Sequence, residues 1–173
     1  MVATNRWWGC DDVWDSDPDF QGVPVQARQA MRMLAPCAPM ETEAIVRCLK
    51  NDRFAARNDI ELLEVRPGFA RAKMTVQPHH WNGLGTVQGG AIFTLADFAF
   101  AAASNSHGTV AVAVNVSISF LQAGREGQLW AEAREISRNP KLGTYTVEVR
   151  NDAGELIALF QGMAYRKQDK LPG

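Results

Sequence analysis

The sequence predicts an α+β fold, in which an antiparallel β-sheet carries its helices on one side. Two strand-like runs, residues 60–65 and 69–76, are joined by the turn Arg66-Pro67-Gly68, and four more strand-like runs follow a long apolar segment in mid-chain. Consecutive strands joined by short turns pair antiparallel, and helices that do not alternate with strands collect on one face of such a sheet. With 173 residues, 46% of them hydrophobic, the chain is long enough to bury one such core.

An N-terminal extension precedes this domain. Residues 1–39 hold three of the five tryptophans, together with several aspartates and prolines. Such aromatic side chains need a surface to dock on, so we expect either a tail packed on its own domain or an arm that binds a partner. Translation from Met40 is a third interpretation. The domain itself is expected at residues 40–168, followed by a short C-terminal tail at 169–173.

The first element of the domain is predicted to be a short amphipathic helix, residues 42–50. Its residues Ile45, Cys48 and Leu49 fall on one face, and Thr42 is a candidate N-cap. The hairpin and the long apolar segment come next. Four later strands, separated by turns that contain Gly or Pro, are expected at about 111–121, 128–138, 143–151 and 155–166.

Charge and hydropathy exclude two classes of partner. Lys and Arg total 18 against 19 Asp and Glu, a net charge of -1, so the chain lacks the positive field that recruits nucleic acid or an anionic membrane. No apolar run reaches the roughly 18 residues of a membrane span, and the N-terminus lacks the pattern of a signal peptide. We therefore expect a cytoplasmic protein with neither nucleic-acid nor membrane partners.

Cysteine and histidine usage argues against a metal site. The three cysteines are widely spaced, which indicates neither a disulfide framework nor zinc ligation. The adjacent pair His79-His80 lacks a third ligand, and we expect it in a solvated loop.

The long apolar segment is expected to form a helix that is apolar all round. Between Gly90 and Ala103 only Thr94 and Asp97 are polar. A helix of this kind must be buried on every side, and one sheet covers only one face of it. The need for burial therefore predicts that a second copy of the protein covers the other face, in a homodimer.

Asp97 is the candidate catalytic residue of this helix. A buried carboxylate is costly unless it is paired or hydrogen-bonded, and no Lys or Arg occurs between Lys73 and Arg125. Either the side chain bonds to nearby backbone, or the protein retains the acid for a chemical role.

The start of the same helix offers a second functional element. Gly85, Gly89 and Gly90 let the backbone approach a ligand closely, and free amides at a helix start attract an oxyanion or a carboxylate. Eight residues separate Gly89 from Asp97, about 12 Å along a helix, so the acid of one chain does not reach its own helix start. Two antiparallel helices at a two-fold axis bring each acid to the other chain's glycines, which predicts two sites shared between subunits.

This stretch resembles the hotdog-fold acyl-CoA thioesterases of the phenylacetate-degradation (PaaI-like) type. Their hallmark is Asn-Gly-x-Gly-x-x-His-Gly-Gly followed by Leu-Ala-Asp, and the chain reads Asn-Gly-Leu-Gly-Thr-Val-Gln-Gly-Gly at residues 82–90 and Leu-Ala-Asp at 95–97. The similarity covers about residues 41–166. It implies a hotdog fold, an antiparallel sheet wrapped around a long central helix. It also implies a dimer or tetramer that hydrolyses an acyl-CoA thioester without a metal or other cofactor.

The resemblance also implies roles for individual residues. Asp97 is expected as the nucleophile or as the general base that activates water, and the sequence does not decide between these roles. A backbone N–H of Gly89 or Gly90 is expected to polarise the thioester carbonyl, and Asn82 to hydrogen-bond the water or the carbonyl region. Gln88 stands where the family has histidine; it forms hydrogen bonds but does not change charge near neutral pH, as a histidine does.

For the coenzyme A part of the substrate, the family uses basic residues on loops at the mouth of the site. This points to Arg138, Lys141 and Arg125, whose charge suits phosphate groups. Asn115 lies on the polar face of its strand, where it is expected to line either the site or a wet subunit interface.

Two other functions stay open at this point. A hotdog domain that binds acyl-CoA without catalysis, and reports it through the Trp-rich extension, fits the loss of the histidine. A pocket that only binds, however, gains nothing from the carboxylate of Asp97. A hotdog hydratase or dehydratase also uses a helix start beside an acid, but generally needs the histidine that Gln88 replaces. Aryl, hydroxyphenylacetyl and medium-chain acyl groups all fit, because one fold hosts unlike substrates.

Overall fold

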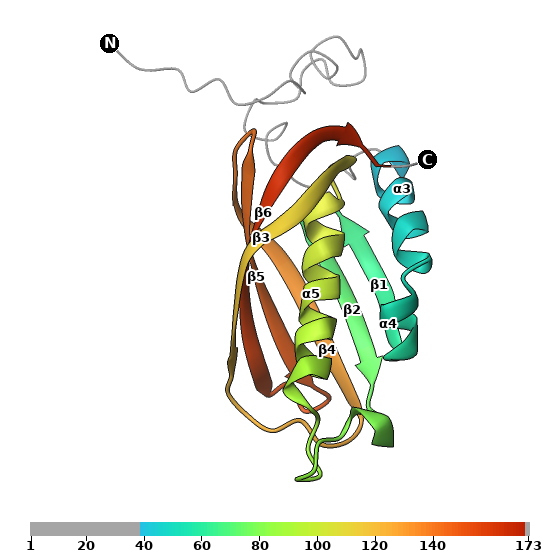
Figure 1. Ribbon diagram of the computed structural model, residues 1–173, viewed down its shortest axis with the longest axis vertical. Coiled ribbons are helices and arrows are strands. Elements are labelled where there is room, and N and C mark those ends of the chain that lie inside the picture. Colours follow the sequence, from blue (N-terminus) through green and yellow to red (C-terminus); the bar gives the residue numbers. More distant parts are fainter. Residues whose placement is uncertain (1–38, 172–173) are drawn as a thin grey trace, which may run out of the picture. The chain divides into compact units, whose positions relative to one another are not determined.

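The structure, a computed structural model, describes residues 39–171 (Figure 1). Its six strands form one antiparallel sheet in the order β1-β2-β4-β5-β6-β3. The elements in chain order are α3 (Pro39–Lys50), α4 (Arg53–Arg57), β1 (Ile60–Arg66), β2 (Phe69–Thr75), the 3₁₀ turn η2 (Pro78–His80), α5 (Gly89–Asn105), β3 (Thr109–Phe120), β4 (Gln128–Arg138), β5 (Leu142–Asn151) and β6 (Leu156–Lys170).

The core lies between α5 and the sheet. α5 contacts all six strands, which curve around it (Figure 1). On the sheet side of α5, Leu95, Ala96 and Ala99 are fully buried, in one cluster with Ala72 of β2 and Ala131 of β4. Small side chains on both surfaces let the helix and the sheet approach closely at the density of a protein interior. The predicted α+β fold, a sheet wrapped around a central helix, is confirmed.

Two predicted boundaries differ from the structure. α3 begins at Pro39, so Thr42 lies inside the helix and is not its N-cap. β6 continues to Lys170 and takes up the first two residues of the segment expected as a C-terminal tail, because β3 pairs with it along its whole length, with Thr109 opposite Lys170. The other strands begin and end within two residues of their predicted bounds.

The short helix α4 was not predicted, since five residues show no helical apolar period. Its first turn is stabilised by Asp52, whose Oδ1 accepts hydrogen bonds of 2.9 Å from the backbone N–H groups of Phe54 and Ala55. Together α3 and α4 flank the edge strand β1 on the side of the sheet that carries α5. The edge strand at the other end of the sheet, β3, has no neighbour beyond β6 within the described residues.

Apart from Pro39, the extension predicted at residues 1–39 lies outside the described residues. Among residues 39–171, no helix combines the length and the apolar character that crossing a membrane requires.

Candidate active site

One stripe of α5 is left uncovered by the sheet. Gly90, Thr94, Asp97 and Ala101 are exposed or half-buried, whereas the residues between them are buried apart from Phe93. Positions three or four apart share one helical face, so the stripe runs along the side of α5 that faces away from the sheet. A single chain therefore provides only the sheet side of the all-round burial expected for this helix, and Asp97 lies on the open side.

Asp97 receives no hydrogen bond and no ion pair from the part of the chain that the structure describes. Burial raises the pKa of its carboxyl above the usual range, and the negative charge of Asp52 at the start of α4 raises it further. The local backbone hydrogen bond that was one explanation for this acid is not formed. A half-buried carboxylate with a raised pKa is a stronger base than a solvated one, which suits proton transfer near neutral pH.

The start of α5 leaves a single backbone amide open. Gln88 is the N-cap: its side-chain Oε1 accepts a hydrogen bond from the N–H of Gly90. Its carbonyl accepts from the N–H groups of Ala91 and Ile92, at 2.9 and 3.3 Å. Of the four amides that a helix start leaves without intrahelical partners, only that of Gly89 finds no acceptor among residues 39–171. Gly89 is therefore the glycine with a donor free for a ligand.

Steric crowding also explains why glycine occupies both positions at the helix start. A Cβ atom on Gly90 would lie 2.6 Å from Oε1 of Gln88 and would displace the cap. A Cβ atom on Gly89 would lie 3.1 Å from the ring of Phe120 on β3. The pair thus allows the close approach of two side chains to the helix start, in addition to any chemical role.

Asn82 organises the loop that leads into α5. Its Oδ1 accepts hydrogen bonds from the N–H groups of Leu84 and Thr86, at 2.8 and 3.3 Å, and its Nδ2 donates to Oγ1 of Thr86 at 2.9 Å. An amide nitrogen carries two hydrogens, so Asn82 keeps one donor for a ligand while it holds the loop.

Comparison with known proteins assigns the family. The family profile described as thioesterase superfamily matches residues 84–158. A putative esterase of Archaeoglobus fulgidus is 45% identical over 124 residues, 71% of this chain and 80% of that protein. The acyl-coenzyme A thioesterase PaaI of Escherichia coli is 38% identical over 118 residues, 68% of this chain and 84% of that protein. This chain is a PaaI-like hotdog thioesterase.

A solved structure agrees with this assignment. The E. coli PaaI protein from the phenylacetic acid degradation operon matches with a TM-score of 0.72 and 33% sequence identity, over 76% of this chain and 99% of that chain. Both the resemblance to the PaaI-like thioesterases and the hotdog fold are confirmed.

The basic residues expected at the mouth of the thioesterase site lie at two ends of the molecule. Arg125 is close to the loop before α5, because its carbonyl accepts a hydrogen bond of 3.1 Å from Nε1 of Trp81. Arg138 and Lys141 flank the β4–β5 turn at the opposite end of the sheet (Figure 1), where Arg138 pairs with Glu135 at 3.4 Å. Asn115 is exposed on β3, as expected for the polar face of that strand.

The solvated position predicted for His79 and His80 is found for His79, which is exposed, and is wrong for His80. His80 is 2% exposed, because η2 folds it beneath the loop, and Asp59, at the start of β1, brings its carboxylate to 3.3 Å from Nε2 of His79. The cluster has the residue types of a metal site. Nδ1 of His80, however, accepts a hydrogen bond of 3.0 Å from the N–H of Gln77, which leaves the proton on Nε2, the atom that faces Asp59. Nε2 itself has no hydrogen-bond partner among the described residues and lies 3.9 Å from Oδ2 of Asp59. Burial lowers the pKa of His80, so the geometry fits a neutral histidine held through Nδ1 better than a metal ligand.

Proposed function

We propose that this thioesterase hydrolyses an acyl-CoA thioester to the free acid and coenzyme A. The site would be formed by Asp97 of one subunit and the Gly89 amide of another. The observation that carries this proposal is that the two open functional groups lie on one helix, eight residues or about 12 Å apart. A thioester carbonyl is too small to touch both within one chain. The likeness to the acyl-coenzyme A thioesterase of E. coli supports acyl-CoA as the substrate class.

Two adjoining surfaces support a dimer. The open stripe of α5 is apolar apart from Thr94 and Asp97. Beside it, the edge strand β3 exposes Val114 and Phe120 by 55% and 52%, and a long exposed apolar edge is one that proteins cover. A second copy, placed with its α5 antiparallel across the first, would cover both surfaces and bring each acid to the other helix start.

In this arrangement the Gly89 N–H donates to the thioester carbonyl oxygen and stabilises the negative charge that develops there. Asp97 takes a proton from a water molecule whose oxygen attacks the carbonyl carbon; alternatively, its carboxylate attacks directly and water hydrolyses the resulting anhydride. In both courses the C–S bond breaks and the coenzyme A thiolate leaves. A thiolate is a weak enough base to depart without a histidine, so the Gln88 cap is compatible with turnover.

The antiparallel arrangement also gives the distant basic residues a role. Asp97 lies at the middle of α5, so the C-terminal half of one helix would extend past the start of its partner. This would place Arg138 and Lys141 of one subunit on the same side as the helix start of the other, where they can bind the phosphates of coenzyme A. Asn115 would lie on the adjoining edge strand.

Mixed dimers test both the activity and the shared site. Gly89→Pro removes the open N–H while keeping the helix, because proline is favoured at the first helical position and Gln88 already has the extended φ of -64° and ψ of 134° that a following proline requires. Gly89→Ala is the matched control, since it adds a Cβ near Phe120 but keeps the N–H. We expect Gly89→Pro to lose roughly 10²–10³-fold in kcat with acyl-CoA substrates, and Gly89→Ala to lose far less.

The decisive measurement is thiol release by a dimer that combines one Gly89→Pro chain with one Asp97→Asn chain, isolated through two different affinity tags. Such a dimer keeps one intact site of two, so about half of the parent activity should return. An inactive mixed dimer would show that both groups act within one chain. A parent chain that releases no thiol from any acyl-CoA would overturn the proposed activity itself.

A further inference from the structure

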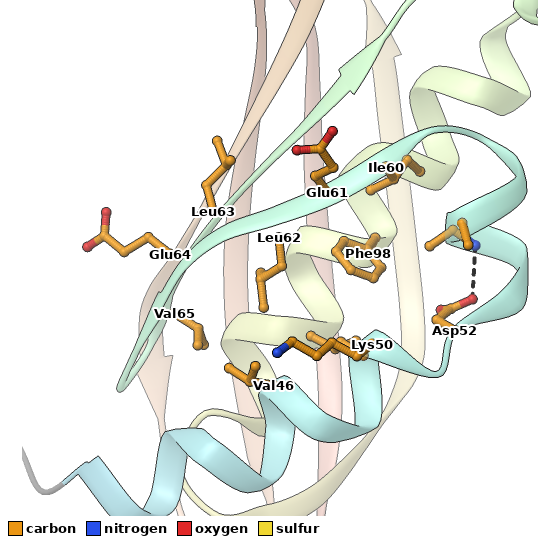
Figure 2. Close-up of a pocket in the computed structure, with 13 residues that line it drawn as sticks. Val46, Lys50, Asp52, Ile60, Glu61, Leu62, Leu63, Glu64, Val65 and Phe98 are labelled. Atoms are coloured by element: carbon orange, nitrogen blue, oxygen red, sulfur yellow. Dashed lines mark hydrogen bonds between the residues drawn. The ribbon is translucent and has the colours of Figure 1, made fainter.

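A pocket of about 410 Å³ opens between α3, α4, β1 and α5 (Figure 2). This volume is within the range of about 300–1,000 Å³ that is usual for small-molecule sites. Its lining is mostly apolar, from Val46, Leu49, Ala55, Ala56, Ile60, Leu62, Val65 and Phe98. Four charged residues also line it: Glu61 and Glu64 point to the other side of β1 from Leu62 and Val65, whereas Lys50, which is exposed, and Asp52 lie on the side of α3 and α4 (Figure 2).

An irregularity in β1 shapes this pocket. The register of the β1–β2 ladder shifts between Leu62, which pairs with Ala72, and Glu64, which pairs with Arg71. The inserted residue, Leu63, lets Leu62 and Val65 face the pocket together, although strict alternation would place residues three apart on opposite faces. Bulges of this kind are over-represented at sheet edges, where β1 lies, as well as beside active sites.

The pocket adjoins the candidate catalytic acid. Phe98, which follows Asp97 in α5, forms one wall, and its side chain lies among those of β1 and α3 (Figure 2). Asp52, at the rim, is close enough to Asp97 for its charge to act on that carboxyl. Asp97 and the other residues of the open stripe do not line the pocket themselves, so Phe98 is the residue of α5 that separates the pocket from the stripe.

We infer that this pocket holds the acyl group of the substrate, and that the preferred substrates carry an uncharged apolar acyl group of several carbons rather than acetyl. This inference rests on the proposed function. Each CH₂ that is removed from water on binding contributes favourably, so binding should improve with chain length until the pocket is full. An acetyl group would leave most of the apolar wall uncovered.

Filling the pocket from the solvent side tests the inference. Ala56 of α4 lines the pocket but is exposed, so Ala56→Phe adds a ring to the space without adding one to the core. Val46→Phe adds a ring from α3, on a different wall. Arg57→Phe is the matched control, because Arg57 is exposed on α4 and does not line the pocket. The measurement is kcat/KM of the full-length variants with octanoyl-CoA and with acetyl-CoA.

We expect both filling variants to lose roughly tenfold or more in kcat/KM for octanoyl-CoA and to change by less than about threefold for acetyl-CoA, with Arg57→Phe unchanged for both. Equal losses for the two substrates, or no loss for either, would overturn the acyl pocket while leaving the thioesterase activity of the parent established. A gain in activity would show that something other than the substrate occupies the space. If the parent hydrolyses neither substrate, this inference fails, whereas the proposed function fails only if no acyl-CoA, aryl or aliphatic, is hydrolysed.

Discussion

Two half-buried carboxylates, Asp97 on α5 and Glu135 on β4, have opposite surroundings. Glu135 accepts a hydrogen bond of 2.7 Å from the hydroxyl of Tyr145 and lies 2.8 Å from Nε2 of His107 and 3.4 Å from Nε of Arg138. Burial disfavours its ionised form, but the contacts with His107 and Tyr145 outweigh burial and hold its pKa below the usual range. Asp97 has burial without partners, and its pKa is raised.

The difference shows how a buried acid that holds the fold can be told from one that is free for chemistry. Glu135 ties β4 to Tyr145 of β5 and to His107, which follows α5, so its charge is used inside the chain. Asp97 makes no hydrogen bond or ion pair with residues 39–171 and is retained at a cost in stability. The presence or absence of bonding partners, rather than the degree of burial, thus distinguishes a structural acid from an acid that is free for chemistry.

The largest expected effect is on activity at Asp97. Asp97→Asn keeps the size of the side chain but removes the base, so kcat/KM for acyl-CoA should fall about 10²–10⁴-fold. The same change should not destabilise the protein at neutral pH, and should raise its Tm, since it removes an unfavourable charge. Thiol release and thermal unfolding of the variant check the two statements. An Asp97→Asn protein that keeps its activity would remove Asp97 from the site.

The stability gain in Asp97→Asn should depend on pH in a defined direction. The folded-state pKa of Asp97 lies above its unfolded value, so the carboxyl costs nothing when it is protonated in both states. The cost appears as pH rises from the usual aspartate range through the raised pKa, and is complete above it. The Tm advantage of the variant should therefore be present at neutral pH and vanish below about pH 4.

The second effect is on stability at Glu135. Glu135→Gln weakens contacts with three partners, and we expect a loss of about 2–3 kcal/mol in the free energy of unfolding, with kcat nearly unchanged in the folded enzyme. Because the folded-state pKa of Glu135 is depressed, its contribution is present at neutral pH and is lost as pH falls through that pKa. Chemical denaturation of parent and variant at several pH values measures both.

Glu148→Gln is the matched control for Glu135. Glu148 pairs with Arg150 at 2.9 Å, but both side chains are more than 40% exposed, and such surface pairs contribute about 0–1 kcal/mol. If the two glutamine variants lose equal stability, the cluster around Glu135 has no special structural role.

The sequence identified Asp97 but not Glu135, and the reason is physical. Asp97 is an acid within an otherwise apolar helix, so the composition of that segment alone identifies it as unusual. Glu135 lies in an alternating strand where an acid is ordinary, and its contacts with His107 and Tyr145 depend on how β4, β5 and the end of α5 meet. The fold class and the strands followed from periodicity, whereas the site shared between two copies of α5 stays a prediction.

The features that could not be predicted from the sequence depend on side-chain geometry and on tertiary contacts. The Gln88 cap decides which of the two glycine amides stays open, and residue types alone do not reveal that cap. The bulge at Leu63 depends on its pairing with β2, and the packing of Asp59 against His79 depends on where η2 lies. Local patterns therefore predict the elements, whereas the donor at the helix start and the pocket require the assembled structure.

The smallest expected effect concerns Asp52, the one residue among those the structure describes whose charge shifts the pKa of Asp97. Asp52→Asn removes that charge but keeps the cap of α4, because asparagine is as good an N-cap as aspartate. The folded-state pKa of Asp97 should then fall, so the acidic limb of the pH profile of kcat/KM should move to lower pH. Asp59→Asn is the control, since Asp59 pairs with His79 and does not act on Asp97. A limb that stays in place in Asp52→Asn and moves in Asp59→Asn would assign the profile to the histidine cluster instead of to Asp97.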